Sequence, residues 1–373
     1  MRTLNIAQIG HGFMGKAHSN AYRQVNRFFD LPVQVHLHTL CGRSEGVEES
    51  ARQLGWTHAE RDWRKVIENP EIDVIDVSTP GHLHAPMAIA AAEAGKAVWC
   101  EKPLGNTLAE AESMVEAVTR TGAAHGLFHN YRAVPAIQLL RRMIDDGRIG
   151  QIYHFRAVYL QDWILSPSFP RVWRLQKSQT GTGAHGDLNA HLIDLAHFLV
   201  GGLTEVSGLM RTFITERPLP DDPSKTGEVD VDDAALALLR FESGAIGSIE
   251  ASRFAAGRKN YNCIEVNGSK GSAVFNLERM NELQFFDRTA ADDAQGFTVI
   301  NVTDQPHPYG GTYWPSGHII GYEHTFINLV AGFIQAMERG EPLNPNFNDG
   351  LRTQRVLEAV ERSHESRAWV ATV

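Results

Sequence analysis

Cysteine is scarce in this sequence, with three in 373 residues. Cys41, Cys100 and Cys263 are far apart and odd in number, so they argue against a disulfide framework and indicate a reducing, cytoplasmic compartment. No run approaches the roughly 18–20 apolar residues of a membrane span, and the first residues contain no apolar signal segment. Positive charge is not in excess either, because the formal net charge is −9. That balance argues against nucleic acid and anionic membranes as partners.

The length predicts about two domains, and the order of elements indicates where the first one ends. Up to residue 130, strand patterns alternate with helical patterns, which predicts a doubly wound parallel sheet. We expect strands at 4–10, 33–42, 72–79, 97–100 and 124–130, and helices at 15–29, 47–56, 84–95 and 108–122. Residues 1–130 are therefore assigned to a first domain of the Rossmann type and residues 131–373 to a second domain.

The pattern changes after residue 150. A long strand is expected at 151–163 and a helix at 186–202. Five strand patterns then follow one another, at 234–243, 244–254, 262–269, 271–278 and 281–286. Consecutive strands with short turns predict an antiparallel or mixed sheet. Two late helices are expected at 321–340 and 350–366, of which the last is expected to pack back on the first domain.

A glycine-rich loop follows the first strand and opens the first helix. It consists of Gly10, His11, Gly12, Phe13, Met14 and Gly15, which is the G-x-G-x-x-G pattern in its required context. Gly10 permits the tight turn, Gly12 lets a pyrophosphate approach the backbone, and Gly15 allows close helix–strand packing. The helix N-terminus adds free N–H groups and a partial positive charge. The loop therefore predicts a dinucleotide site.

The residues at the end of the second strand should determine which of the two nicotinamide cofactors is preferred. An acidic residue there would bind the ribose of NAD, but the sequence has Cys41, Gly42, Arg43 and Ser44. Arg43 and Ser44 can hold the 2′-phosphate of NADP through charge-assisted hydrogen bonds. The alternative is that Arg43 is a solvated loop residue. This stretch slightly favours NADP.

The third strand ends in polar residues. Ser78, Thr79 and Pro80 should lie beside the dinucleotide, because ligands bind at the carboxyl edge of such a sheet. His84 follows as a cofactor contact or a capping residue. His82 and His84 are two residues apart, but no cysteine or carboxylate cluster accompanies them, so we expect no metal site.

Two further motifs bring acidic and basic groups together. Glu101 and Lys102 come directly after the buried strand at 97–100, and Pro103 ends it. One interpretation is a solvated ion pair; the other is a functional cation at the edge where ligands bind. Asp187 and His191 are four residues apart and share one face of a predicted helix. A carboxylate there can orient an imidazole that titrates near neutral pH.

These stretches together resemble the Gfo/Idh/MocA oxidoreductases. The glycine-rich loop, "STPGHLHAPMAIAAAEAGKAVWCEKPL" and "GDLNAHLID" carry the resemblance, which extends over essentially the whole chain. It implies an α/β Rossmann domain followed by an α+β domain with an open, mainly antiparallel sheet. It also implies NAD or NADP as cofactor, a sugar or inositol as substrate, and a homodimer or homotetramer.

The resemblance implies roles for single residues. The Glu-Lys-Pro motif of the family falls on Glu101, Lys102 and Pro103, which implies that Lys102 contacts both substrate and nicotinamide, with Glu101 positioned beside the cofactor. The second-domain motif falls on Asp187–Asp194 and implies catalytic roles for its first aspartate and for His191. Asn189 stands where the family usually has glycine, so its side chain is expected to contact substrate or narrow the pocket.

Other stretches resemble the members that oxidise the 3-hydroxyl of a levoglucosan-like anhydrosugar with NAD. They are "GFMGKAHS", "NYR" at 130–132, "YLQDW" at 159–163, "WRLQKS" at 173–178 and "VDVDD" at 229–233. The candidates for substrate binding are Tyr131, Arg132, Gln161, Asp162 and Trp163. An aromatic face with an amide and an acid suits the apolar face and hydroxyls of a sugar, and the alternative for Trp163 is strand-end packing. The NAD use of those members conflicts with Arg43, so NAD or NADP stays open.

Together these observations predict reversible hydride transfer between nicotinamide and a secondary hydroxyl of a sugar, anhydrosugar or inositol. His191 is the expected base, Lys102 polarises the hydroxyl oxygen, and Asp187 orients His191 and can also bind a hydroxyl. Two other classes remain. One is an NAD-dependent glycosidase of the same fold, and the other is a non-catalytic dinucleotide sensor. The presence of all three residues argues against the sensor, which has no need for proton transfer.

Overall fold

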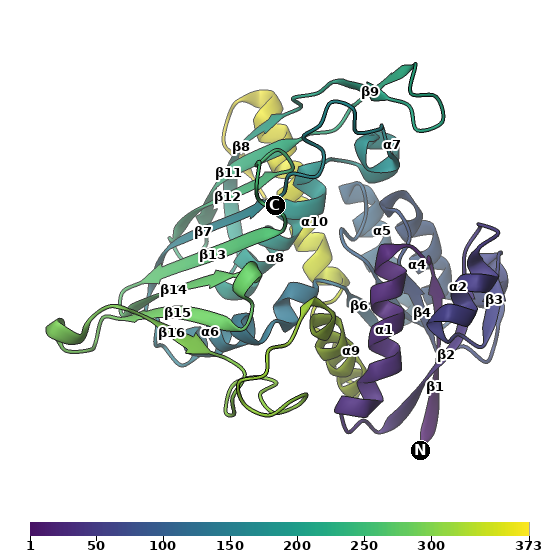
Figure 1. The fold of residues 1–373 in the computed structure, drawn as a ribbon, viewed down its shortest axis with the longest axis horizontal. Coiled ribbons are helices and arrows are strands. Elements are labelled where there is room, and N and C mark those ends of the chain that lie inside the picture. Colours follow the sequence, from purple (N-terminus) through teal and green to yellow (C-terminus); the bar gives the residue numbers. More distant parts are fainter. Residues whose placement is uncertain (373) are drawn as a thin grey trace. The chain divides into compact units, whose positions relative to one another are not determined.

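The computed structural model describes residues 1–372 and divides into two compact units (Figure 1). The first unit consists of Met1–Ala133 with Gly321–Leu351, and the second of Val134–Ile320 with the chain from Arg352 onward. The division expected from the sequence, 1–130 and 131–373, differs from this one because Gly321–Leu351 returns to the first unit. Among the described residues, no helix is long and apolar enough to cross a bilayer.

The first unit is built on a six-stranded parallel sheet. The strands are β1 (Arg2–Ile9), β2 (Val33–Cys41), β3 (His58–Glu60), β4 (Val74–Val77), β5 (Ala97–Cys100) and β6 (His125–Leu127). Their spatial order is β3-β2-β1-β4-β5-β6, which is the doubly wound order expected from the alternating sequence pattern. The order reverses between β1 and β4, the switch point at which such sheets bind ligands.

Six helices of the first unit connect or cover these strands. They are α1 (Phe13–Phe28), α2 (Val47–Leu54), α3 (Trp63–Glu68), α4 (His84–Glu93), α5 (Leu108–Thr121) and α9 (Tyr322–Arg339). Local signals set their ends. A capping box of Thr107 and Glu110 begins α5, and Gly122 ends it in the left-handed conformation, with φ of 71°.

Helix α9 joins the first unit through aromatic packing. Phe333 lies 5.6 Å from Trp99 and 5.7 Å from Phe128 between ring centroids. Gly126 makes room for this helix, because a Cβ there would lie 2.7 Å from the Phe333 ring. We expected the last helix to pack back on the first domain. The start of that helix, α10 (Phe347–Ser366), does so, with Phe347 in the core of the first unit, and α9 returns to the same unit.

The second unit contains a nine-stranded sheet. Its strands are β7 (Ile152–Leu160), β8 (Leu203–Arg211), β11 (Ala234–Phe241), β12 (Ile246–Ser252), β13 (Tyr261–Gly268), β14 (Gly271–Asn276), β15 (Glu282–Asp287), β16 (Phe297–Asn301) and β17 (Val370–Ala371). The order is β16-β15-β14-β13-β7-β12-β11-β8-β17. Strands β7 and β12 pair in parallel and the other neighbours are antiparallel. The predicted mainly antiparallel sheet is confirmed.

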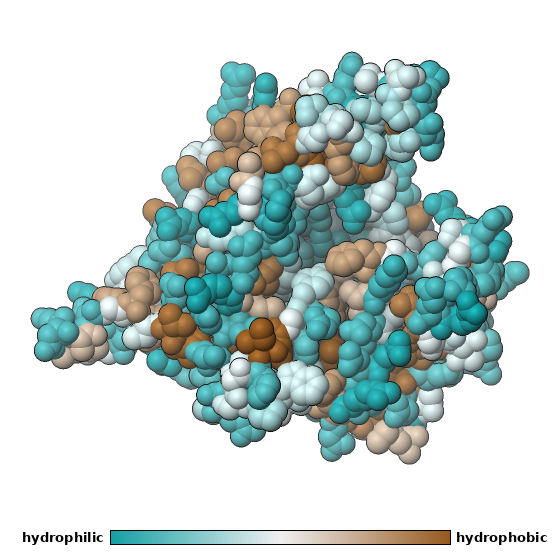
Figure 2. Space-filling model, viewed as in Figure 1, coloured by the Kyte–Doolittle hydropathy of each residue, from teal (hydrophilic) through white to brown (hydrophobic). Residues whose placement is uncertain are grey.

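Helices cover one face of this sheet and leave the other open (Figure 1). The helices of the unit are α6 (Pro135–Asp145), α7 (Lys177–Thr180), α8 (Ala190–Leu199) and the later part of α10. Along β11 the side chains alternate, so that Ala237 and Leu239 are buried while Leu236 and Leu238 are exposed. Figure 2 shows hydrophobic side chains at the surface over the strands of this sheet.

Shorter elements complete the chain. Strands β9 (Glu216–Pro218) and β10 (Thr226–Glu228) form a separate hairpin within 215–233, the stretch richest in proline and aspartate. A π-helix at His185–Asn189 runs directly into α8. Single 3₁₀ turns lie at Gly81–Leu83, Asn130–Ala133, Trp173–Leu175, Leu277–Arg279 and Asp292–Ala294.

Candidate functional site

The glycine-rich loop is tightly packed at its two ends. Gly10 has φ of 116°, and a Cβ there would lie 2.5 Å from the carbonyl oxygen of Ser78. A Cβ at Gly15 would lie 2.4 Å from the carbonyl oxygen of Gly10. Both glycines are therefore required by the loop itself, because no side chain fits at either position.

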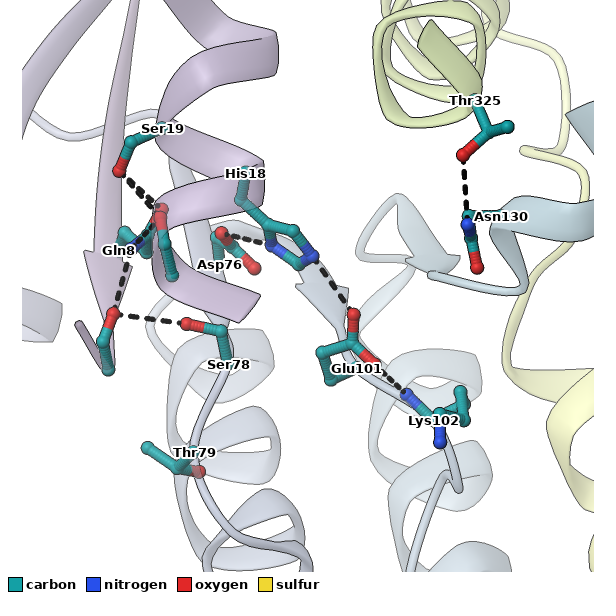
Figure 3. A network of polar contacts seen from close by, with 12 residues as sticks. Gln8, His18, Ser19, Asp76, Ser78, Thr79, Glu101, Lys102, Asn130 and Thr325 are labelled. Carbon is teal, nitrogen blue, oxygen red and sulfur yellow. Dashed lines mark hydrogen bonds and ion pairs between the residues drawn. The ribbon is translucent and has the colours of Figure 1, made fainter. Parts of the chain in front are cut away.

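Polar side chains of the first unit hold this loop from behind (Figure 3). Gln8 donates its amide N–H to the carbonyl oxygens of Gly10 and Gly15, at 2.7 and 3.0 Å. The Ser78 hydroxyl donates to the carbonyl oxygens of Ile9 and Gly10, both at 3.2 Å. Ser78, expected beside the dinucleotide, thus uses its hydroxyl to fix the loop. Thr79 and Pro80, expected there too, are half-buried.

Gly12 differs from its neighbours in having empty space beside it. A Cβ added at Gly12 meets nothing within 4 Å. Gly12 is also the N-cap of α1, and no side chain caps that helix end. The first N–H groups of α1 therefore remain available to a ligand, and helix N-termini with such groups bind phosphates. These residues fit a dinucleotide pyrophosphate, next to an exposed Phe13 and a half-buried Met14.

The end of β2 is organised by His11 of the loop. The His11 ring lies with Nε2 at 2.8 Å from the Ser44 hydroxyl and Nδ1 at 3.1 Å from the Ser50 hydroxyl. A Cβ at Gly42 would lie 2.3 Å from the His11 ring, so this position has no room for a side chain. Arg43 is exposed. Sequence reasoning named Arg43 and Ser44 for the 2′-phosphate of NADP but missed the contact of Ser44 with His11.

His84 joins the ends of two strands. Its Nε2 lies 2.9 Å from the carbonyl oxygen of Thr79, and its Nδ1 lies 3.0 Å from that of Pro103. The ring is 1 % exposed, and burial lowers the pKa of His84. We expected a cofactor contact or a cap. The structure shows a buried link from the Ser-Thr-Pro turn to the Glu-Lys-Pro turn.

His18, which the sequence did not single out, links α1 to the Glu-Lys-Pro turn (Figure 3). Its Nδ1 lies 2.9 Å from Asp76 Oδ2, and its Nε2 lies 3.0 Å from Glu101 Oε1. The second carboxylate oxygen of Glu101 accepts the backbone N–H of Lys102 at 3.0 Å. Because Glu101 is 4 % exposed and faces His18, the interpretation as a solvated ion pair is wrong. Glu101 instead fixes the backbone of Lys102.

This buried cluster carries a charge on His18. Burial alone would lower the pKa of His18, but the carboxylates of Asp76 and Glu101 outweigh it and raise the pKa to about 9. His18 is therefore an imidazolium at neutral pH, with both ring nitrogens donating. Phe128 stacks on the ring with centroids 3.8 Å apart, so water has no access from that side.

Tyr131 and Arg132, expected to bind substrate, lie inside the first unit. Tyr131 is 3 % exposed and Arg132 is 5 % exposed. Arg132 donates to Asn344 Oδ1 at 2.7 Å and pairs with Asp349 at 3.2 Å. These bonds hold the segment after α9 against the end of the first sheet. They favour a structural role for Arg132 over a substrate contact.

In the second unit, one edge of the sheet gathers the other candidates. Strands β7 and β12 run in parallel with Leu160 opposite Ser252, so the residues after both strands meet at the same edge. The backbone N–H of Gln161 donates to the carbonyl oxygen of Ser252 at 2.8 Å. Arg253 follows Ser252 and is therefore a neighbour of Gln161 and the residues after it.

Gln161 and Trp163 belong to one hydrogen-bonded chain at that edge. Trp163 Nε1 donates to Gln161 Oε1 at 2.9 Å, and Gln161 Nε2 donates to Asn260 Oδ1 at 2.9 Å. The Tyr159 hydroxyl donates to the same Asn260 oxygen at 2.7 Å. Sequence reasoning did not select either residue for the site, although Tyr159 begins the YLQDW stretch at 159–163; nothing in its own segment marks Asn260.

Asp162 serves the backbone next to this chain. It pairs with Lys259 at 2.8 Å and accepts the N–H of Gly257 at 3.0 Å. The hydrogen bond from Lys259 lowers the pKa of Asp162. These contacts occupy the carboxylate in a turn, so they favour a structural role over a sugar contact.

Asp187 and His191 lie on one helical segment whose first turn is π-helical. The π-turn spans His185–Asn189, and α8 continues from Ala190; such turns are frequent at functional sites. The Asp187 side chain is 33 % exposed and pairs with Arg253 at 2.8 Å. His191 is 7 % exposed, and its ring lies 6.0 Å from that of Tyr159.

Asn189 does not face outward from this turn. It is fully buried, and its amide nitrogen lies 3.1 Å from His185 Nδ1 and 3.3 Å from the carbonyl oxygen of Ala235. We expected Asn189 to contact substrate or narrow the pocket. Its contacts favour a core role, in which it connects the helical segment to β11.

The aspartates of "VDVDD" hold the start of the same segment. Asp232 accepts the backbone N–H groups of Gly183 and His185, both at 2.7 Å. Asp233 accepts that of Phe213 at 2.7 Å, and Asp230 accepts that of Lys177 at 2.7 Å. The aspartates of this motif thus hold the backbone of neighbouring segments in place. Across residues 1–372, no group of three or more His, Cys, Asp or Glu side chains could hold a metal ion.

Comparison with known proteins decides the family. An oxidoreductase family model with an NAD-binding Rossmann fold matches residues 4–129, and a GFO/IDH/MocA C-terminal domain matches residues 137–274. A levoglucosan dehydrogenase of Pseudarthrobacter phenanthrenivorans is 42 % identical over 99 % of this chain and 98 % of its own. The chain belongs to the Gfo/Idh/MocA family. It is an NAD(P)-dependent oxidoreductase, and the predicted likeness to levoglucosan dehydrogenase is confirmed.

Solved structures of similar proteins agree with the fold over the whole chain. Levoglucosan dehydrogenase in complex with NADH and L-sorbose has a TM-score of 0.97 at 42 % identity, covering 100 % of both chains. An oxidoreductase domain protein from Kribbella flavida has a TM-score of 0.97 at 49 % identity with the same coverage. A myo-inositol 2-dehydrogenase of Thermotoga maritima is 26 % identical over 98 % of both chains.

Proposed function

We propose that this protein oxidises a secondary hydroxyl of a levoglucosan-type anhydrosugar with NAD. The observation that carries the proposal is the 42 % identity to levoglucosan dehydrogenase, which extends over 99 % of this chain. Other sugars and inositols are the alternative substrate classes. NAD is preferred over NADP because levoglucosan dehydrogenase, at 42 % identity, has been solved in complex with NADH, although Arg43 alone favours NADP.

The chain's own residues supply binding and proton transfer. When bound, the nicotinamide supplies the hydride acceptor. The glycine-rich loop and the N-terminus of α1 hold the pyrophosphate, with Gly12 leaving room for it. His191 takes the hydroxyl proton as general base, and Asp187 accepts a hydrogen bond from a substrate hydroxyl. Lys102, whose backbone Glu101 and His18 hold, donates to the reacting oxygen and stabilises its developing negative charge.

A substrate panel tests this function. Levoglucosan, simple aldoses and ketoses, and inositols are each supplied with NAD and, separately, with NADP, and the reduced cofactor is followed by its absorbance. We expect the highest kcat/KM for the anhydrosugar with NAD. Higher kcat/KM for an inositol would change the substrate class, and no steady cofactor reduction with any of these polyols would contradict the proposal.

Variants test the assigned roles. Lys102→Ala and His191→Ala should each lower kcat by on the order of 10²–10⁴. The affinity for NAD should persist, because the pyrophosphate contacts come from the loop. Lys65→Ala, at an exposed lysine of the first unit, is the control and should match the wild type. A full kcat in either test variant would remove that residue from the mechanism.

We also propose a homodimer or homotetramer that forms through the open face of the nine-stranded sheet. Leu209, Leu236 and Leu238 are 61, 42 and 54 % exposed on that face. Leu236 lies opposite Leu209 in the ladder, so their side chains form one apolar surface. Ion pairs of Arg156 with Glu265 and of Arg240 with Glu205 lie on the same face and suit the polar part of an interface.

The three free cysteines support a cytoplasmic location.

A further inference from the structure

Arg253 stands out among the charged residues of the second unit because it is buried with few partners. The residue is 1 % exposed and follows β12 directly. Its Nη2 donates to Asp187 Oδ2 at 2.8 Å. Its Nε and Nη1 are inaccessible and have no hydrogen-bond partner in the described structure.

A guanidinium in this position is a poor source of stability. Removing a cation from water costs several kcal/mol, which is recovered only when its N–H groups are satisfied. An apolar side chain of similar volume would avoid the unsatisfied N–H groups of Arg253. Retention of such a group suggests a role other than folding.

A second buried arginine of the same unit shows the contrasting, structural arrangement. Arg217 is 0 % exposed and is therefore as deeply buried as Arg253. Its Nη atoms donate to the carbonyl oxygens of Ile164, Ser166 and Phe169, at 2.7, 2.9 and 3.4 Å. Its Nε has no hydrogen-bond partner among residues 1–372, as in Arg253, but both of its Nη atoms are bonded. Arg217 thus holds a loop by its backbone, whereas Arg253 holds a side chain.

The pair of Arg253 and Asp187 is asymmetric. The arginine side chain is 2 % exposed and the aspartate side chain is 33 % exposed. The cation therefore lies beneath the anion, and the anion keeps access to solvent. The guanidinium carbon also lies 5.2 Å from the ring centroid of Trp163, within the range of a cation–π contact. One buried group thus contacts a proposed catalytic residue and a candidate substrate residue.

We propose that Arg253 is a positioning residue that holds the Asp187 carboxylate ionised and oriented as an acceptor for a substrate hydroxyl. A carboxylate paired with a guanidinium is a weak proton acceptor, so the proton of the reacting hydroxyl goes to His191. Arg253 thereby separates the two roles within one helical segment. This inference rests on the proposed function, since it needs a hydroxyl-bearing substrate.

The two aspartates that end the VDVDD motif bond to backbone N–H groups instead. The Asp233 carboxylate accepts backbone N–H groups of Phe213 and Ile214, although its carbonyl oxygen accepts the N–H of Arg253. The Asp232 carboxylate accepts those of Gly183 and His185. Asp187 is therefore the carboxylate that the Arg253 guanidinium meets.

Steady-state kinetics over a pH range test the inference, with the best sugar from the panel and NAD. Arg253→Met should lower kcat/KM by on the order of 10–100-fold, because Asp187 loses its orientation. It should also add a second protonation to the acid limb of the kcat/KM profile, below that of the general base His191, because a carboxylate that loses an adjacent cation binds its proton more tightly. Arg253→Lys keeps the charge but loses the planar fork, so it should recover part of both effects.

Arg217→Lys is the matched control for Arg253→Lys. It changes a guanidinium of equal burial, so a loss of packing should lower the melting temperature of both variants. Only the Arg253 variants should change the pH profile. A wild-type rate and profile in Arg253→Met and Arg253→Lys would overturn the inference, and so would the same added protonation in Arg217→Lys. If Arg253→Met does not fold, the comparison of Arg253→Lys with Arg217→Lys still tests the inference.

A thermal unfolding cycle separates failure of this inference from failure of the proposed function. Asp187→Asn leaves a buried cation unpaired in the wild-type background but not in Arg253→Met. It should therefore lower the melting temperature more in the wild type. Equal losses overturn the inference, whatever the sugar panel shows. A panel with no turnover contradicts the proposed function, while the cycle still tests whether Arg253 holds Asp187.

Discussion

The reason for a glycine at position 12 differs from the reason at the two glycines that flank it in the loop. Gly10 and Gly15 have no room for a Cβ, whereas Gly12 has open space. The fold should therefore tolerate a side chain at Gly12, and only a ligand that approaches the backbone should not. Gly12→Val is expected to unfold at the wild-type temperature but to bind NAD at least on the order of 10²-fold more weakly, since the pyrophosphate contacts are lost.

Isothermal titration with NAD and thermal unfolding measure both quantities. Gly332→Val is the control, because Gly332 is an exposed glycine of α9 with nothing within 4 Å of an added Cβ. It should bind NAD as the wild type does. Unchanged NAD affinity in Gly12→Val would place the dinucleotide elsewhere.

His18 should make stability depend on pH on the alkaline side. Its pKa in the folded protein is about 9, against an ordinary 6.5. A raised pKa contributes stability that is full below 6.5 and is lost as the pH rises through 9. The difference corresponds to roughly 3 kcal/mol in the free energy of unfolding. Urea unfolding of His18→Gln should therefore show a smaller loss between pH 6.5 and 9 than the wild type. Parallel pH dependences would mean that His18 is not charged in the folded protein.

His125 should make stability depend on pH in the opposite direction, on the acid side. Burial lowers its pKa to about 4, with Asp349 opposing the change, and its Nδ1 accepts the backbone N–H of Phe347 at 3.0 Å. Stability from this neutral ring is present above pH 6.5 and is lost as the pH falls through 4. His125→Asn keeps an acceptor but cannot gain the proton, so its unfolding free energy should fall less between pH 6.5 and 4. An acid-side slope equal to that of the wild type would contradict this expectation.

At the scale of elements, the start of the helical segment that carries Asp187 depends on Asp232. Asp232 accepts two backbone N–H groups there, and a Cβ at Gly183 would lie 1.8 Å from the Asp232 carbonyl oxygen. Asp232→Ala should lower the free energy of unfolding by about 1.5–3 kcal/mol. It should also lower kcat, because Asp187 and His191 move with the segment.

The control for this prediction is Asp222→Ala in the neighbouring loop. Asp222 also accepts a backbone N–H, that of Ser224, but pairs with Lys225 near the surface. Its loss should change the free energy of unfolding by less than about 0.5 kcal/mol and leave kcat unchanged. A wild-type kcat in Asp232→Ala would separate the aspartate motif from the candidate site.

Elements with a strong local pattern were predictable, and those shaped by distant contacts were not. Strand β5 was expected at 97–100 and is found there, because its apolar run ends at a polar turn. Strand β8 was missed because Gly208 interrupts its alternation. The reason for Gly208 lies far along the chain, since a Cβ there would lie 2.7 Å from Val360. Helix α6 was also missed, although Pro135 at its first position is a local start signal.

The same distinction applies to the candidate site. The glycine-rich loop, Lys102 and the pair of Asp187 and His191 carry local motifs, and the sequence named them. His18 bonds to residues 58 and 83 positions away, and Arg253 to one 66 positions away. No spacing rule links residues that far apart, so these contacts appear only once the sheets have formed.

At the scale of the whole molecule, the open sheet face should govern assembly. Arginines at Leu236 and Leu238 would place two charges on the proposed interface. The double variant Leu236→Arg/Leu238→Arg should elute as a monomer, measured by size exclusion with light scattering, whereas the wild type should be a dimer or tetramer. Ile319→Arg, at a residue that is 73 % exposed outside the strands, should assemble as the wild type does. A monomeric wild type would end this proposal.

The return of Gly321–Leu351 to the first unit has a consequence for biosynthesis. A ribosome must make nearly the whole chain before α9 exists to cover Trp99 and Phe128. Until then the nascent first unit exposes apolar surface, which is the condition under which chaperones bind and chains aggregate. A stop codon before residue 321 should therefore yield insoluble protein, even though it leaves the six-stranded sheet and its glycine-rich loop intact in sequence.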